Sequence, residues 1–214
     1  EKHLPIELLG PLGCGIQTGA GAVMRSLNAP AGSAMLITGG GSVGLSAVMG
    51  SVIQGCGAII LVEPMAKRRE LAMELGATHT IDPATTKDLA EAVRNIVPLG
   101  VDNALDTTGI PDVLNASLAS LGSKGTLGLV GITAGGTPLP GEVNAVMTLG
   151  QSVKGIIEGD SDPDVFLPEL LKHYEEGRLP IDKLIKTFKL SEINEAIADQ
   201  HSGGCVKAIL LPDA

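Results

Sequence analysis

Three glycines, Gly39, Gly41 and Gly44, follow a short apolar run with the spacing G-x-G-x-x-G. In such a turn the first glycine permits a tight bend, and the second lets the backbone approach a pyrophosphate. The third lets the following helix pack closely on a sheet. The backbone N–H groups of Ser42 and Val43 would point at the anion, together with the positive end of the helix dipole. The pattern therefore predicts a dinucleotide-binding turn.

An acidic residue, Glu63, ends the next apolar run. Its distance from the last glycine, 63 − 44 = 19 residues, is close to the spacing of about 20 in dinucleotide-binding units. The carboxylate would accept hydrogen bonds from the adenosine ribose and repel a 2′-phosphate, which favours NAD over NADP. Arg68 and Arg69 lie nearby and would accommodate that phosphate, so the strictness of this preference stays open. The alternative is that the glycines are ordinary turns and Glu63 is a solvated strand end.

The elements around these residues alternate between strand and helix. Apolar runs at 33–38, 57–62, 79–81, 101–106 and 126–130 predict strands, and the segments 42–54, 67–75, 87–96 and 112–121 predict helices. Helix 42–54 has a face of small residues that can lie close to a sheet: Val43, Ser46, Ala47 and Gly50. Repeated strand–helix units with short connections predict an α/β fold, a doubly wound parallel sheet of the Rossmann type.

Composition and charge exclude several classes of protein. The chain has 214 residues, 44% of them hydrophobic, and a formal net charge of −9, so a basic face for nucleic acid or an anionic membrane is not expected. Its three cysteines are too few and too scattered for a disulfide framework, which favours a reducing, cytoplasmic location. No apolar run of about 20 residues and no leader segment is visible, so we expect no membrane partner.

The character of the sequence changes after residue 157. A turn-rich stretch at 159–163 is followed by predicted helices at 164–176 and 191–200 and a terminal strand at 206–211. We expect three parts: residues 1–17, a Rossmann domain at 18–157, and a C-terminal segment at 158–214.

In these features the chain resembles the zinc-dependent medium-chain alcohol dehydrogenases, over nearly its whole length. The matching runs are Gly13–Gly21, Thr38–Leu45, Glu63, Leu75–His79, Val101-Asp102, Thr108-Gly109 and Val130-Gly131. The run Gly155–Ser161 is most similar to the aryl-alcohol (benzyl-alcohol) dehydrogenase branch.

The resemblance implies roles for individual residues. Cys14 matches a ligand of the catalytic zinc, and Thr18 matches a hydroxyl that meets the nicotinamide, so these two are the catalytic candidates. Where many relatives carry Arg, this chain has Ile110, which leaves one cofactor contact in doubt. The other implied cofactor contacts are Arg68 at the adenosine ribose, Thr107 and Thr108 at the riboses, Val130, Gly131 and Ile132 at the carboxamide, and Lys207 at the pyrophosphate.

The zinc site implied by the resemblance is incomplete. A catalytic zinc needs about three protein ligands, and Cys14 supplies one. In the family, the remaining ligands lie in an N-terminal catalytic domain that nothing in this sequence matches. Residues 1–17 and 158–214 are therefore expected to be remnants of that domain, flanking a cofactor-binding part that is inactive alone.

For the intact enzyme, the resemblance implies oxidation of a primary, aryl or benzylic alcohol to the aldehyde. Hydride passes to NAD, and zinc acts as the Lewis acid. Two alternatives stay open: a zinc-free quinone or enoyl reductase of the same superfamily, and a non-catalytic nucleotide-binding module. The expected partners are a small alcohol or aldehyde substrate and further copies of the chain, in a dimer or tetramer formed through the sheet edge within residues 131–157.

Overall fold

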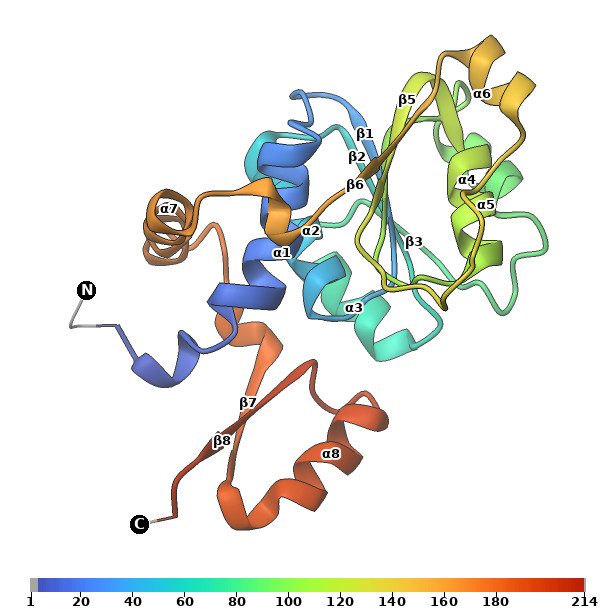
Figure 1. The fold of residues 1–214 in the computed structure, drawn as a ribbon. Coiled ribbons are helices and arrows are strands. Elements are labelled where there is room, and N and C mark those ends of the chain that lie inside the picture. The colour runs from blue at the N-terminus through green and yellow to red at the C-terminus, as the bar shows by residue number, and fades with distance from the viewer. Residues whose placement is uncertain (1–3, 214) are drawn as a thin grey trace.

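The computed structural model describes residues 4–213, and a six-stranded parallel sheet lies at its centre (Figure 1). The strand order is β3-β2-β1-β4-β5-β6, and every neighbouring pair is parallel. This arrangement confirms the predicted doubly wound sheet. The strands are β1 (Ala34–Thr38), β2 (Ala58–Val62), β3 (His79–Ile81), β4 (Val101–Asp106), β5 (Leu121–Leu129) and β6 (Ser152–Gly155).

Helices cover both faces of the sheet (Figure 1). Along β1, Met35 and Ile37 belong to one apolar cluster and Leu36 to another, because successive side chains of a strand point to opposite faces. All three side chains are fully buried, as expected for a parallel strand between two helical layers. One layer contains α2 (Ser42–Gln54) and α3 (Ala66–Glu74), and the other contains α4 (Leu89–Ile96), α5 (Pro111–Ala119) and α6 (Val143–Leu149).

Local residues fix the ends of these helices. The Asp88 carboxylate accepts a hydrogen bond from Glu91 N at 3.0 Å and caps α4. Pro111 opens α5, and Gly55 closes α2 with a left-handed φ of 75°. Strand β5 begins at Leu121, five residues earlier than predicted. Its pairing with β4 is irregular before Asn103, so the sequence pattern showed only the regular second half.

A continuous helical run not predicted from the sequence crosses helix α2. It consists of a π-helical segment (η2, Leu12–Ile16), α1 (Gln17–Gly21) and a second π-helical segment (η3, Ala22–Ser26). The predicted boundary between residues 17 and 18 falls inside this run. The small residues of α2 pack largely on α1 instead of on the sheet: a Cβ built at Gly50 would lie 3.1 Å from the Ala20 Cα.

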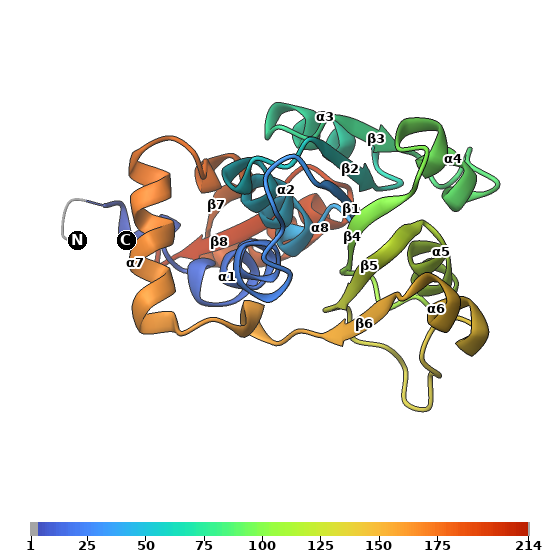
Figure 2. The ribbon, with the colours of Figure 1, turned by 90° about the horizontal axis from the view of Figure 1, so that it is seen from above.

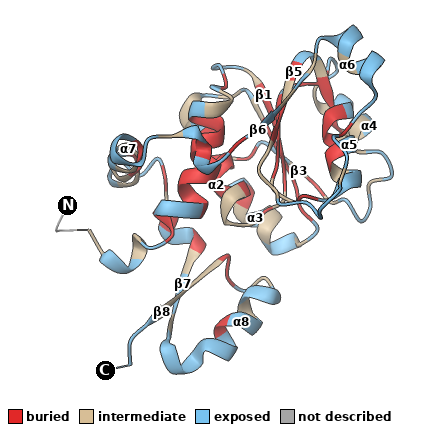
Figure 3. Cartoon of the chain, viewed as in Figure 1, coloured by how far each residue is buried: buried red, intermediate tan, exposed pale blue. Residues whose placement is uncertain are grey.

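The chain after β6 passes beside α1 before it reaches the C-terminal elements (Figure 2). A short turn (η4, Glu158–Asp160) is followed by α7 (Pro163–Glu175), whose Phe166 and Leu170 are buried in the same apolar cluster as α2. Strands β7 (Ile185–Lys189) and β8 (Lys207–Leu211) form a separate parallel pair, connected through α8 (Ile193–His201). Helix α8 is largely exposed, and the residues of the strand pair are half-buried or exposed (Figure 3).

Short single-turn helices complete the description: η1 (Ile6–Leu8), η5 (Ile181–Leu184) and η6 (Leu190–Glu192). Within residues 4–213, no helix has both the length and the apolar character needed to cross a bilayer.

Candidate functional site

The predicted glycine turn lies at the carboxyl end of β1, and each of its three glycines meets a different structural demand. Gly39 has a φ of 96°, a left-handed conformation that favours glycine. Gly41 has an ordinary backbone conformation, φ −79° and ψ −172°, and a Cβ built on it would meet no atom within 4 Å. A Cβ on Gly44 would collide with the Gly39 carbonyl oxygen. Gly39 thus permits the bend, Gly41 leaves an open surface, and Gly44 permits close packing.

The first turn of α2 presents backbone N–H groups without intrahelical acceptors. No side chain caps this helix, and its first backbone hydrogen bond runs from Leu45 N to Gly41 O at 2.9 Å. The N–H groups of Ser42, Val43 and Gly44 therefore have no partner within the helix. Together with the helix dipole, they form a surface suited to an anion above Gly41.

Glu63 lies under this turn and holds it in place. Its side chain is 4% exposed. One carboxylate oxygen, Oε2, accepts a hydrogen bond from Gly40 N at 2.6 Å, and Oε1 accepts one from Met65 N at 2.9 Å. The residue thus connects the end of β2 to the glycine turn, and each oxygen keeps a further lone pair for another donor.

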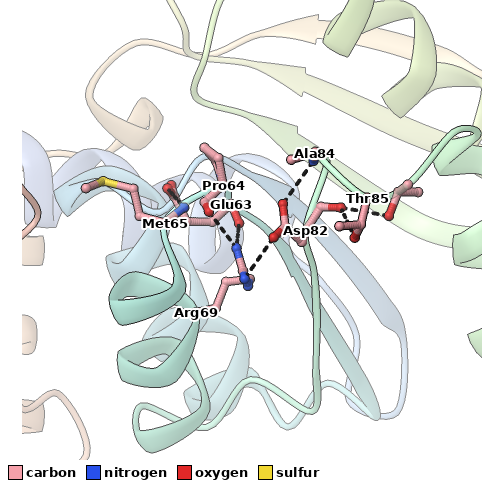
Figure 4. Close-up of polar contacts among 8 residues, drawn as sticks. Glu63, Pro64, Met65, Arg69, Asp82, Ala84 and Thr85 are labelled. Atoms are coloured by element: carbon pink, nitrogen blue, oxygen red, sulfur yellow. Dashed lines mark hydrogen bonds and ion pairs between the residues drawn. The ribbon is translucent and has the colours of Figure 1, made fainter.

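The two arginines that follow Glu63 differ in their contacts. Arg69 Nη1 donates to the carbonyl oxygens of Glu63 and Pro64, both at 2.7 Å, and Nη2 pairs with Asp82 Oδ2 at 2.9 Å (Figure 4). Its charge is therefore engaged in holding the loop after β2. For Arg68 the described residues provide no hydrogen bond or ion pair, and its Nε is buried without a partner. Of the two, Arg68 alone keeps its charge available for a ligand.

Two cavities adjoin this region. The first, of about 200 Å³, lies beside the carboxyl end of β2 and has a largely apolar lining that includes Val62, Pro83, Leu89 and Val113. The second, of about 320 Å³, separates α3 from the C-terminal strands and is lined by Lys67, Arg68, Leu71, the segment 183–186 and the segment 203–206. The apolar cavity suits a flat aromatic ring, whereas the second has a cationic lining.

Asp106 organises the neighbouring strand end and is fully buried. Its Oδ1 accepts hydrogen bonds from the hydroxyls of Thr38 and Thr108, both at 2.7 Å, and its Oδ2 accepts one from Gly109 N at 2.8 Å. The Thr107 hydroxyl donates to Thr38 O at 2.8 Å. Nothing in the sequence distinguishes Asp106 from other acidic residues at strand ends. The structure shows that it ties β1 to the loop that carries Thr107 and Thr108.

The end of β5 completes this edge of the sheet. Val130 N and Gly131 N donate to the Asp106 carbonyl oxygen at 3.0 and 3.1 Å. Ile132 is 96% exposed. The predicted residues on β1, β2, β4 and β5 therefore meet at the carboxyl ends of the strands. The strand order reverses at β1, and in open α/β sheets ligands bind in the crevice at such a switch point.

Thr18 reaches the site from α1 and contacts a residue that sequence reasoning missed. The Thr18 side chain is 7% exposed, and its hydroxyl donates to Glu158 Oε2 at 3.0 Å. Gln17 Nε2 donates to Glu158 O at 3.4 Å. The run that contains Glu158 had served only to indicate a family branch. A contact between residues 140 positions apart has no local signal in the sequence.

Two of the predicted residues lie apart from these contacts. Cys14 is exposed on the π-helical segment η2, and residues 4–213 contain no group of three His, Cys, Asp or Glu side chains that could hold a metal ion. The part of the chain that the structure describes thus offers one thiolate to a zinc ion, not a complete site. Lys207 opens β8 in the separate two-stranded sheet, is half-buried, and makes no hydrogen bond or ion pair with the glycine turn, residues 39–44.

The other two cysteines are poor nucleophiles. Burial raises the pKa of the Cys56 thiol, and burial together with the nearby Asp199 carboxylate raises the pKa of the Cys205 thiol. Both effects favour the neutral thiol over the reactive thiolate. Neither thiol is therefore a candidate active-site nucleophile.

The same combination of elements is found in known proteins. A family model described as zinc-binding dehydrogenase matches residues 42–174. This chain belongs to the zinc-binding dehydrogenase family. The finding confirms the resemblance inferred from the sequence.

Relatives within the family are alcohol dehydrogenases. The chain is 42% identical over 208 residues to the geraniol dehydrogenase of Castellaniella defragrans, covering 97% of this chain and 56% of that protein. An alcohol dehydrogenase zinc-binding domain protein from Burkholderia ambifaria superposes with a TM-score of 0.96 at 47% identity, covering 100% of this chain and 58% of that one. For the benzyl alcohol dehydrogenase of Acinetobacter calcoaceticus the TM-score is 0.95 at 40% identity, with 100% and 59% covered. The chain spans about half the length of the curated relatives it matches.

Proposed function

We propose that this chain is the NAD-binding part of an alcohol dehydrogenase. The observation that carries the proposal is the turn from Gly39 to Gly44: an open surface over Gly41, N–H groups without intrahelical acceptors, and a buried Glu63 that fixes the turn. A dinucleotide pyrophosphate is the ligand that this combination suits best.

The remaining cofactor contacts follow from the arrangement around that turn. The adenosine ribose lies at Glu63 and the adenine ring in the apolar cavity beside Val62 and Val113. The nicotinamide half lies on the other side of the switch point, along Thr107 and Thr108, the segment 130–132 and Thr18. When bound, the cofactor supplies the hydride acceptor. The chain's own residues bind and orient it, and Asp106 holds their loops in register.

The contacts of the two arginines bear on cofactor choice. Glu63 opposes a 2′-phosphate by charge, and Arg69 is engaged with Asp82 and two carbonyl oxygens. Unlike Arg69, Arg68 has no hydrogen bond or ion pair among the described residues. We propose a preference for NAD, with Arg68 limiting how strict that preference is.

The substrate is proposed to be a primary, apolar alcohol, of the aryl or benzylic kind. Ile132 and Ile157 are 96% and 80% exposed, and both lie at the carboxyl edge of the sheet beside the proposed nicotinamide site. Large exposed apolar side chains at a site favour an apolar ligand. The names of the geraniol and benzyl alcohol dehydrogenases support the same choice.

Zinc is part of the proposal, with Cys14 as one of its ligands. The described residues contain no group of three His, Cys, Asp or Glu side chains that could hold a metal ion, so a zinc ion bound at Cys14 would need further ligands from outside residues 4–213. The division into residues 1–17, 18–157 and 158–214 is likewise proposed, with the first and last parts belonging to the catalytic domain. Residues 1–3 of the first part lie outside the described residues.

Assembly through the sheet edge is also proposed. Within residues 4–213, strand β6 pairs only with β5, so its other edge is open. Beside it, Leu139, Val143 and Met147 are at least 70% exposed and line a cavity of about 450 Å³. A second copy that pairs along β6 would bury these side chains. The free thiols of all three cysteines fit the cytoplasmic location expected from the sequence.

Titration calorimetry with NAD and NADP tests the central proposal. We expect NAD to bind more tightly, and absence of binding by both nucleotides would overturn it. Zinc analysis of the whole protein and of Cys14→Ser separates the zinc enzyme, which loses metal on substitution, from a zinc-free reductase, which contains none. Oxidation of benzylic alcohols then separates an enzyme from a nucleotide-binding module, for which turnover is absent although NAD binds.

A further inference from the structure

The turn Glu158–Asp160 adopts a backbone conformation that its residue types disfavour. Glu158 and Asp160 both have a φ of 48°, and Gly159 between them has a φ of 69°. A non-glycine residue in the left-handed region costs about 1–2 kcal/mol and persists only where its surroundings enforce it. Here the enforcing contact is close packing: a Cβ on Gly159 would lie 2.6 Å from the Gly21 Cα and 2.9 Å from Gln17 O.

This packing directs the Glu158 side chain to a defined place. Its carboxylate accepts the Thr18 hydroxyl at 3.0 Å, and Thr18 is followed by Gly19, which packs on the carbonyl of Val43 in the phosphate-binding turn. Glu158 therefore reaches the proposed nicotinamide end of the site from the turn after β6, a segment that contains none of the predicted cofactor contacts.

The negative charge of Glu158 has no neutralising partner among the described residues. The nearby cation Lys154, on β6, is engaged by other groups: its Nζ lies 3.1 Å from Asp160 Oδ2 and donates to Ser26 O at 2.9 Å. Lys154 is therefore not available to neutralise Glu158.

We infer that Glu158 sets the relative affinity of the site for oxidised and reduced nicotinamide. The inference rests on the proposed function, which places the nicotinamide beside Thr18. The oxidised ring carries a positive charge and the reduced ring carries none, so a carboxylate fixed beside the ring attracts only the oxidised form. This attraction ends when hydride reaches the ring. Glu158 thus acts as a positioning and charge-setting residue that favours NAD⁺ entry and NADH release.

The inference predicts a change in a ratio of dissociation constants. Glu158→Gln keeps a side chain of similar size but removes the charge. We expect the ratio of the Kd of NAD⁺ to the Kd of NADH to rise about tenfold, equivalent to about 1.4 kcal/mol. A purely structural role of Glu158 would weaken both forms alike and leave the ratio unchanged.

Equilibrium titrations of the whole protein with NAD⁺, NADH and ADP-ribose provide the test. ADP-ribose lacks the nicotinamide and reports on the adenosine and pyrophosphate contacts alone. The matched control is Asp160→Asn, which removes a charge from the same left-handed turn, where the carboxylate pairs with Lys154. We expect ADP-ribose affinity to be unchanged in Glu158→Gln and the ratio to be unchanged in Asp160→Asn.

Each contrary outcome has a defined meaning. A shift of the ratio below twofold in Glu158→Gln, or an equal shift in Asp160→Asn, overturns the inference. If Glu158→Gln also loses ADP-ribose binding, Glu158→Asn decides on the same criterion, because Asn tolerates the left-handed conformation. Failure of the unmodified protein to bind ADP-ribose and both nucleotides refutes the proposed function itself.

Discussion

Replacement of Gly41 by alanine separates the folding role of the glycine turn from its binding role. A Cβ at this position would meet no protein atom within 4 Å, and the backbone angles suit any L-residue. The added methyl group therefore meets no steric obstacle and restricts the unfolded chain, but alanine is a poorer N-cap of α2 than glycine. Because these two effects oppose each other, we expect the free energy of unfolding to change by less than about 1 kcal/mol.

The same methyl group occupies the space that we assign to the pyrophosphate. Overlap of one methyl group with a closely fitted neighbour costs about 1–3 kcal/mol. The expected loss of NAD affinity is thus about 5- to 150-fold. Gly44→Ala should instead impair folding, because a Cβ at Gly44 collides with the Gly39 carbonyl oxygen.

Urea unfolding and titration calorimetry with NAD measure both quantities on the same samples. Gly135→Ala serves as the control, since a Cβ at Gly135 also meets open space but lies far from the turn in sequence. Wild-type NAD affinity in a stably folded Gly41→Ala variant would refute the placement of the pyrophosphate over Gly41.

Four further substitutions probe the supporting contacts. Glu63→Gln replaces one acceptor under Gly40 and removes the negative charge, so NAD should bind about tenfold more weakly. The ratio of the Kd of NADP to the Kd of NAD should fall, and an unchanged ratio would contradict the role of Glu63. Arg69→Ala should lower the free energy of unfolding by about 1–2 kcal/mol in urea while leaving the same Kd ratio intact. Asp106→Asn should cost about 2 kcal/mol, because one of its buried oxygens no longer accepts; a change below about 0.5 kcal/mol would count against the network. Burial, reinforced by Arg178, lowers the pKa of His173, so the unfolded chain binds more protons than the folded chain as the pH falls through about 6.5. Unfolding free energy should therefore decrease from about pH 7.5 to about pH 5.5, and less so in His173→Gln, as measured by urea titrations at each pH.

The parts of the fold and site that the sequence predicted depend on local signals. Apolar runs and capping glycines placed β1, β2, α2 and the glycine turn close to their observed limits, because strand burial and tight turns leave marks within a few residues. The carboxyl edge of the sheet then brought Glu63, Thr107 and the segment 130–132 together by topology alone.

The parts that were missed depend on contacts between distant segments. The glycine-rich run that contains α1 has no amphipathic pattern, since it is buried between α2 and the Glu158–Asp160 turn on nearly all sides. Asp106 looked like any acid at a strand end until its four donors were visible. Helix α6 contains no buried residue, so no periodic apolar face predicted it.

The hydrogen bonds of Glu63 and of Glu158 join segments at very different separations along the chain, and this difference sets the order in which the site forms during folding. Glu63 reaches Gly40 across 23 residues, whereas Thr18 meets Glu158 across 140. Contacts of short sequence separation form early, and long loops close late. A chain emerging from the ribosome would thus complete its adenosine end while the nicotinamide end still awaits synthesis. In pulsed hydrogen exchange, the Gly40 amide should gain protection before the amide of Ile156, which joins β6 to β5.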